Sequence, residues 1–224
     1  VELSVDGVTI SVTGFVDRVD GWVHDGRLYL RVVDYKTGKK SFDLTEVWNG
    51  LGLQMLLYLF TLERNGGHLF SQGTAAGVEY LWADPAPENI IRPETDDAEP
   101  LQAQNYPLEG LLLDEPSIYH AMDTRGTGAF VPLSFSAKTG EPTAQSAKAR
   151  LADREKFNRI RDHLDGMLTD MAKNLYSGEI DAAPLVPNAG KSPCLWCEYR
   201  TVCRHADGEG ERTPLKPDDP FGAE

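Results

Sequence analysis

Two strand-like segments separated by a tight turn place the strongest constraint on this fold. Residues 13–22 and 27–35 are each predicted to form a strand, and the sequence between them ends in Asp25-Gly26. Asp-Gly favours a two-residue hairpin turn, because both central positions require φ > 0. An antiparallel hairpin about this turn pairs residues whose numbers sum to 51. The sequence therefore predicts both the start of a sheet and its register.

This register brings charged residues together on one face of the hairpin. Asp17 falls opposite Asp34, and Lys36 lies two residues further along the same face. Side chains of opposed residues are about 4.5–5.5 Å apart, so two carboxylates there repel each other unless a cation or proton lies between them. A divalent metal would satisfy the pair. The alternative is a solvated sheet face on which Lys36 is the ion-pair partner of the acids.

A third acid on the same strand has a simpler explanation. Asp20 falls opposite Arg31, which is the arrangement of an ordinary cross-strand salt bridge. A β-bulge in the hairpin would shift the register by one residue and exchange the roles of Asp17 and Asp20.

The remaining pattern predicts a mixed α/β core over residues 1–187. Val8, Ile10 and Val12 alternate as in a half-buried strand, and further strands are expected near 78–82 and 130–135. A helix should start near Asp43 and end before residue 65. A long helix over 146–177, ended by Gly178, should bury one apolar stripe, formed by Phe157, Ile160, Leu164, Met167, Met171 and Leu175.

Charge is distributed unevenly along the chain, which has a formal net charge of -13. Residues 84–115 contain nine acidic side chains and a single basic one, Arg92, so 84–110 is interpreted as an acidic loop or insertion. Basic residues gather instead between Lys148 and Lys173 and at Lys39-Lys40, which are the surfaces expected to contact DNA. The absence of an apolar run of about 18 residues predicts no membrane helix. The expected location is the cytoplasm. The first residue, Val1, lies within a strand pattern, which suggests a fragment of a longer protein.

Three motifs resemble the PD-(D/E)XK nuclease superfamily in its RecB-like branch. They are GFVDRVDGW, VVDYKTG and, in the following helix, LQMLLYLF. The resemblance implies a restriction-endonuclease-like fold, in which helices flank a mixed central sheet. It also implies an active site formed by Asp17, Asp34, Lys36, Gln54 and Tyr58, with a metal held by Asp17, Asp34 and the Tyr35 carbonyl. Taken without the resemblance, Gln54 and Tyr58 could equally be a buried polar pair that ties the helix to the sheet.

Later segments resemble the AddB subunits of bacterial AddAB helicase-nucleases. These segments are GLLLDEPSIYHAMD, the strand FVPLSF, the long helix and CLWCEYRTVC. The family has an upstream helix and a first cysteine that do not occur in this sequence. The resemblance implies an AddA-type helicase-nuclease partner, single-stranded DNA ends as substrate, and a role in processing double-strand breaks for recombination repair.

The C-terminal segment, 188–224, carries the three cysteines of the chain. Cys194, Cys197 and Cys203 form a C-x2-C-x5-C pattern, in which metal ligation is favoured over disulfides in a reducing compartment. The resemblance to AddB implies a [4Fe-4S] cluster whose fourth ligand comes from the upstream segment. Without that ligand the cluster should be absent and the segment should be flexible and loosely held. A zinc site that uses His205, or cysteines without a ligand, are the alternatives.

The function expected from these residues is that of a Mg2+-dependent (or Mn2+-dependent) deoxyribonuclease, an exonuclease that hydrolyses phosphodiester bonds. The alternative is a module without nuclease activity that binds DNA or acts as a scaffold for a helicase, because fold resemblance alone does not guarantee chemistry. The intact pair Asp34 and Lys36 favours the enzyme.

Overall fold

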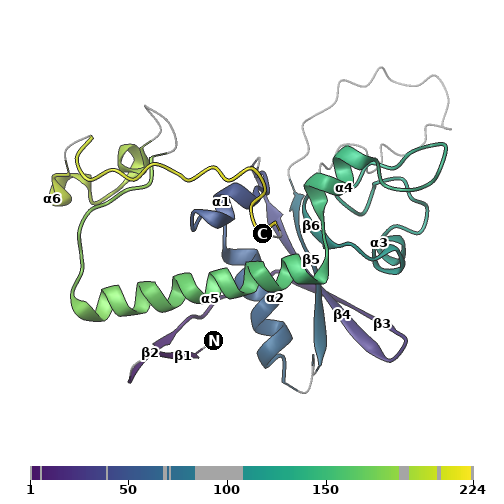
Figure 1. The fold of residues 1–224 in the computed structure, drawn as a ribbon, viewed down its shortest axis with the longest axis horizontal. Coiled ribbons are helices and arrows are strands. Elements are labelled where there is room, and N and C mark those ends of the chain that lie inside the picture. Colours follow the sequence, from purple (N-terminus) through teal and green to yellow (C-terminus); the bar gives the residue numbers. More distant parts are fainter. Residues whose placement is uncertain are drawn as a thin grey trace.

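A mixed five-stranded sheet forms the centre of the protein (Figure 1). The computed structural model describes residues 2–5, 7–38, 40–67, 70, 72–83, 108–186, 192–205 and 208–222. The strands are β3 (Arg18–His24), β4 (Arg27–Lys36), β5 (Gly73–Trp82), β6 (Leu108–Leu113) and β7 (Leu151–Ala152), in that spatial order. The pairs β3/β4 and β5/β6 are antiparallel, whereas β4/β5 and β6/β7 are parallel. A separate antiparallel hairpin consists of β1 (Glu2–Val5) and β2 (Val8–Ser11). The predicted mixed sheet is confirmed.

The β3–β4 hairpin has the register that the sequence predicts. Its turn residues Asp25 and Gly26 have φ values of 48° and 73°, as a two-residue turn of this type requires. The pairing then runs without a slip from His24 opposite Arg27 to Arg18 opposite Val33. Asp20 lies opposite Arg31, so no bulge exchanges Asp20 with Asp17.

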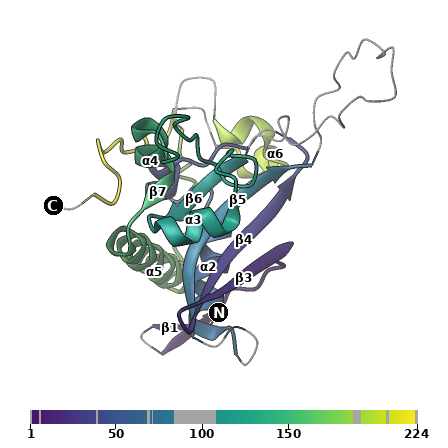
Figure 2. The same ribbon diagram turned by 90° about the vertical axis from the view of Figure 1, so that its right-hand side faces the viewer.

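Helices cover the sheet on both faces (Figure 2). On one face α2 (Gln54–Asn65) packs against β4 and β5, and α5 (Arg154–Ser177) contacts α2. On the other face lies α3 (Pro116–Met122), above the strands (Figure 2). Side chains alternate along a strand, so Asp34 and Lys36 point to the α2 face together with the fully buried Leu30 and Val32.

The first predicted helix is in fact two helices. Asp43 caps α1 (Leu44–Trp48) by accepting a hydrogen bond from the Thr45 amide at 2.7 Å. The chain then breaks at Gly50 and Gly52, whose φ values of 84° and 65° are incompatible with a continuous helix. The prediction of one helix was wrong because two glycines interrupt an otherwise helical pattern.

The predicted long helix over 146–177 is also divided. The helix α4 (Ala144–Arg150) ends where the two buried residues of β7 pair with β6, and Asp153 then caps α5. Phe157, Ile160 and Leu164 are buried as predicted, but Met171 and Leu175 are 54% and 66% exposed. Gly178 ends the helix at φ 80°, as expected.

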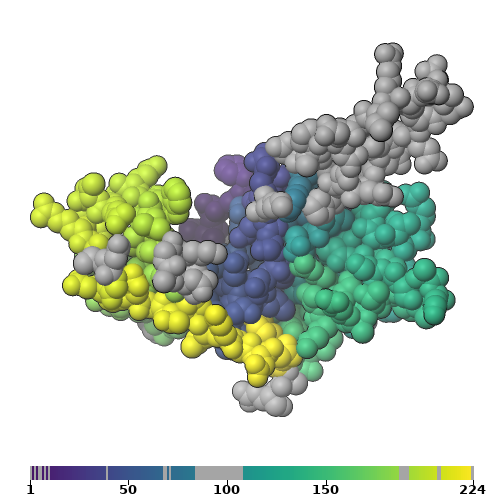
Figure 3. Space-filling view, turned by 90° about the horizontal axis from the view of Figure 1, so that it is seen from above, coloured from purple at the N-terminus to yellow at the C-terminus, as the bar shows by residue number. Residues whose placement is uncertain are grey.

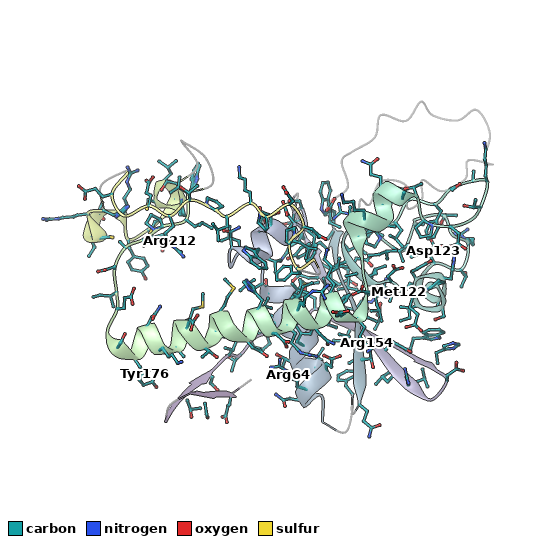
Figure 4. The ribbon with its side chains drawn as sticks, in the orientation of Figure 1. Arg64, Met122, Asp123, Arg154, Tyr176 and Arg212 are labelled. Atoms are coloured by element: carbon teal, nitrogen blue, oxygen red, sulfur yellow. The ribbon has the colours of Figure 1, made fainter. Side chains whose placement is uncertain are left out.

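The strand expected over 130–135 does not form; there Phe135 makes only an isolated bridge to Pro142. Side-chain hydrogen bonds organise the preceding loop instead. The buried carboxylate of Asp123 (Figure 4) accepts main-chain N–H groups from Thr127, Gly128 and Ala129 at 3.1, 2.7 and 3.1 Å. Of the acidic segment 84–110, residues 84–107 lie outside the described residues, and residues 108–110 belong to β6.

The C-terminal segment leaves the core and then returns to it. It passes through a short 3-10 helix, η1 (Pro193–Trp196), and α6 (Arg200–Cys203), and Figure 3 shows the last residues, in yellow, running back across the molecule. Asn49 exchanges two hydrogen bonds with the main chain of Leu215, each 2.8 Å long. Phe221 is 4% exposed and packs edge-on against Trp48 and His163. Residues 212–222 are therefore attached to the core, which differs from the flexible terminus expected from the sequence.

Within the described ranges, no helix is both long enough and apolar enough to cross a membrane.

Candidate active site

The end of the β3–β4 hairpin brings the predicted acids together. Asp17 immediately precedes β3, and its exposed carboxylate accepts a hydrogen bond from the Tyr35 amide at 3.0 Å. This contact ties Asp17 to the strand that carries Asp34 and Lys36. The hairpin thus places all three predicted side chains at one end of the sheet, where α2 covers it.

The carboxylate of Asp34 lacks a hydrogen bond where one is expected. Asp34 is 6% exposed, and its Oδ2 is fully buried without a hydrogen-bond partner among the described residues. The Lys36 ammonium lies 2.6 Å from that oxygen, outside hydrogen-bond geometry, so the contact is an ion pair. A buried charged oxygen that has an ion pair but no hydrogen bond remains costly, so a ligand bound there would stabilise it.

These residues fit a hard divalent cation such as Mg2+. Such an ion is commonly held by one or two carboxylates, with water and substrate phosphate completing its shell. Asp17 and Asp34 supply the two carboxylates, and the main-chain carbonyl of Tyr35 lies in the strand between Asp34 and Lys36. In the part of the chain that the structure describes, no group of three or more His, Cys, Asp or Glu side chains could hold a metal ion.

Gln54 and Tyr58 are hydrogen-bonded to each other and are not a buried pair. Gln54 is exposed and donates a hydrogen bond from Nε2 to the Tyr58 hydroxyl at 2.9 Å. The Tyr58 ring packs against Gly14: a Cβ atom added at Gly14 would lie 2.6 Å from Cε1 and 2.7 Å from the hydroxyl of Tyr58. Tyr58 of α2 therefore supports the segment that leads into Asp17.

Sequence reasoning missed Tyr80 as a member of this site. Tyr80 lies opposite Asp34 in the parallel β4/β5 register, and its ring centroid is 5.7 Å from the Lys36 ammonium. Burial, followed by the negative charges of Asp34 and Glu46, raises the pKa of Tyr80 to about 12. The signal in the sequence was an isolated tyrosine in an apolar strand, which is typical of any sheet core.

A second charged cluster lies on the opposite face of the sheet. Asp20 accepts hydrogen bonds from both Arg18 and Arg31 at 2.7 Å, and Arg31 also contacts Glu79 at 2.9 Å. Burial acts against ionisation of Asp20, but the hydrogen bonds from the two arginines lower its pKa overall. Glu79 is 3% exposed, and burial raises its pKa to about 7. The predicted pair of Asp20 and Arg31 is confirmed as part of this larger cluster.

The basic helix expected to contact DNA is largely neutralised by acids. Four of the basic side chains between Lys148 and Lys173 form ion pairs, and a fifth pair joins Arg64 of α2, labelled in Figure 4, to an acid of α5. The pairs are Arg150 with Glu109, Lys156 with Asp219, Arg159 with Glu155, Arg161 with Glu63, and Arg64 with Asp165. Lys40 is 3.9 Å from Glu46, and Lys39 lies outside the described residues.

The three cysteines are free thiols and do not form a metal centre in this structure. Cys194 is half-buried, whereas Cys197 and Cys203 are exposed. In the described ranges they are not gathered as three ligands of one ion. His205, the alternative fourth ligand, has a buried Nε2 without a hydrogen-bond partner among the residues that the structure describes.

Comparison with known protein families agrees with this geometry. The PD-(D/E)XK nuclease superfamily matches residues 1–204. The chain belongs to this superfamily. The match includes both acids, the lysine, the glutamine and tyrosine of α2, and all three cysteines.

Similar sequences include several proteins named as the B subunit of an ATP-dependent helicase/deoxyribonuclease. The protein of Exiguobacterium sibiricum is 31% identical over 206 residues, which is 89% of this chain and 18% of that protein. The proteins of Clostridium botulinum (strain Loch Maree) and Clostridium perfringens (strain ATCC 13124) are 30% and 31% identical over 88% of this chain and 17% of their own length. The chain therefore spans less than a fifth of the length of these relatives.

Proposed function

We propose that this PD-(D/E)XK domain is a metal-dependent deoxyribonuclease that hydrolyses phosphodiester bonds as an exonuclease. The observation that carries the proposal is Oδ2 of the buried Asp34, which has an ion pair with Lys36 but no hydrogen bond, on the strand that the Tyr35 amide ties to Asp17. A fold alone does not require a buried carboxylate at this position, and a divalent cation held there would offset the cost of burying it. A bound Mg2+ or Mn2+ would polarise the scissile phosphate and lower the pKa of a coordinated water.

The side chains of the site have separable roles in this proposal. Asp17 and Asp34, with the Tyr35 carbonyl, would hold the metal. Lys36 carries the positive charge that would stabilise the phosphate as negative charge develops on it. The exposed amide of Gln54, held by the Tyr58 hydroxyl at 2.9 Å, is placed to contact the DNA backbone.

The decisive experiment compares Asp34→Asn and Lys36→Ala with the unchanged chain on a labelled single-stranded oligonucleotide. We expect cleavage in Mn2+ or Mg2+ to fall by about 10²- to 10³-fold in both variants, as when a preorganised electrostatic group is removed from an active site. Asp170→Ala, which removes an exposed acid on α5, is the matched control and should cut normally. Fluorescence anisotropy with the same DNA should show binding preserved in every variant. Undiminished cutting by Asp34→Asn would refute the assignment.

The relatives suggest a wider setting for this activity. Their names describe the B subunit of a helicase/deoxyribonuclease, so we propose that the domain acts together with an AddA-type helicase-nuclease in the cytoplasm. Its substrate would be the single-stranded ends of unwound duplex, during double-strand break processing for recombination repair. Co-purification of a longer protein containing this domain with such a helicase-nuclease tests the partner directly.

A second candidate function is a DNA-binding or scaffolding module without nuclease activity. The ion pair between Lys36 and Asp34 favours it, because an ammonium that already neutralises the acid can substitute for a metal. Electron paramagnetic resonance of Mn2+ separates the two functions. A nuclease should bind Mn2+ in a manner that Asp34→Asn weakens, whereas a scaffold should show no such difference.

The three cysteines support a separate proposal, that of a [4Fe-4S] cluster in a longer protein. Cys194, Cys197 and Cys203 can supply three of its four ligands, and the fourth must come from elsewhere. His205 would instead complete a zinc site. Iron and zinc analysis of a longer protein purified without oxygen distinguishes the two metals.

A further inference from the structure

The Lys36 ammonium has two neighbours, and they differ in what they can do during the reaction. One is Oδ2 of Asp34 at 2.6 Å, and the other is the face of the Tyr80 ring, whose centroid is 5.7 Å away. A cation within about 6 Å of a ring centroid is attracted by the negative face of the ring. Both contacts therefore hold the ammonium in the same region of the site.

Metal binding by Asp34 would weaken its hold on Lys36. A divalent cation on the carboxylate draws off negative charge, and the two positive charges repel each other. Lys36 would then need a second contact to keep its place. A long lysine side chain loses about 2 kcal/mol of rotamer freedom when it is fixed, so an undirected ammonium would sample many positions.

Tyr80 remains available when Asp34 is occupied. Its ring is uncharged, so its contact with Lys36 does not use the Asp34 carboxylate. The residue is 3% exposed and lies in the middle of the sheet, directly beside Asp34 in the β4/β5 register. Its ring also packs against Phe42, with centroids 6.5 Å apart. The position of the ring is thus fixed by the core, independently of what binds at the mouth of the site.

We propose that Tyr80 is a positioning residue, whose ring face holds the Lys36 ammonium beside the scissile phosphate. This inference rests on the proposed nuclease function and adds a residue to it. The interaction uses the face of the ring and not its hydroxyl. Phenylalanine should therefore replace Tyr80 without loss, whereas a side chain of similar bulk without a π system should not.

The test measures kcat and KM for single-stranded DNA in variants of the full chain. Tyr80→Phe should retain kcat within about twofold, and Tyr80→Leu should lower it about 2- to 30-fold with little change in KM, as expected from the strength of a cation–π contact. Replacing Tyr80 by phenylalanines with one, two and three ring fluorines removes the negative face stepwise without changing shape. The logarithm of kcat should fall in step with fluorine number.

Tyr29 provides the matched control for loss of a core tyrosine. It is 5% exposed and lies on β4, but it points to the opposite face of the sheet. Tyr29→Leu should lower the free energy of unfolding without changing kcat in the folded fraction. If Tyr80→Leu does not fold, the fluorinated series still decides, because those side chains preserve the packing.

Two outcomes would overturn the inference. One is a kcat independent of fluorine number, and the other is a Tyr80→Phe variant as slow as Tyr80→Leu, which would assign the effect to the hydroxyl. Failure of the nuclease proposal looks different: the unchanged chain would then cut no better than Lys36→Ala. A second readout needs no metal, because the ε-methylene protons of Lys36 should lose the ring-current shift of their NMR signal in Tyr80→Leu and keep it in Tyr80→Phe.

Discussion

Glu79 should make the protein less stable as the pH rises from mildly acidic to neutral. Its carboxyl is 3% exposed in the middle of β5, on the face of the sheet away from the site, and Arg31 contacts it at 2.9 Å. Burial disfavours the charged form more than Arg31 favours it, so the pKa of Glu79 is raised from its ordinary 4.5 to about 7.

The sign of the effect follows from proton binding in the two states. Between pH 4.5 and pH 7 the folded chain keeps a proton on Glu79 that the unfolded chain has lost. Stability contributed by this group is therefore complete below pH 4.5 and declines as the pH rises to about 7. Each pH unit in this window costs about 1.4 kcal/mol, which amounts to about 3 kcal/mol in the free energy of unfolding.

Urea denaturation at intervals from pH 4.5 to pH 8, in the presence of EDTA, measures this decline. Glu79→Gln keeps the shape of the side chain and an acceptor for Arg31 but cannot titrate. The difference in the free energy of unfolding between the unchanged chain and this variant should change by about 3 kcal/mol across the window and stay constant above pH 7. Glu155→Gln, an exposed carboxyl, serves as the control. Parallel curves for the unchanged chain and Glu79→Gln would refute the reasoning.

Two further substitutions test the contacts that build the site and close the fold. Gly14→Ala places a methyl group 2.6 Å from the Tyr58 ring, so the free energy of unfolding measured by urea denaturation should fall by about 1–3 kcal/mol. DNA cleavage should also slow, because the same segment carries Asp17. Normal cleavage would show that this packing is dispensable. Phe221→Ala removes a buried ring from Trp48 and should lower the free energy of unfolding by about 3–5 kcal/mol, whereas Leu215→Ala, which keeps the main-chain contacts to Asn49, should cost much less.

Local signals in the sequence predicted the hairpin, because a specific turn sequence, Asp25-Gly26, lies between two segments that are predicted to be strands. Asp25-Gly26 sets the register, and the register places Asp20 opposite Arg31, with Asp17 directly before the first residue of β3. The cap at Asp43 and the helix end at Gly178 are likewise local features, and both are confirmed. Features that depend on neighbours in sequence could therefore be predicted.

Features that depend on distant partners could not. The strand β7 consists of two residues inside an apparently helical pattern, and it exists because β6 offers an unpaired edge. Tyr80 joins the site only through the parallel pairing of β4 with β5, which sequence patterns do not specify. The expected strand over 130–135 failed for the same reason, since β-propensity without a partner strand gives no ladder.

The return of the chain end to the core changes the topology of the cysteine-bearing segment. Residues between Gly178 and Leu215 are anchored at both ends, by α5 on one side and by the contacts of Asn49 and Phe221 on the other. The segment thus departs from the C-terminal end of α5, where Leu175 and Tyr176 are exposed, and its last residues are held against α1 and α5. A single proteolytic cut within it would leave two pieces that remain associated through the buried phenylalanine, as in a split protein that reassembles from complementary parts. Any ligand that orders the segment would also tighten the attachment of the last residues to α1 and α5, because a shorter loop costs less entropy to close.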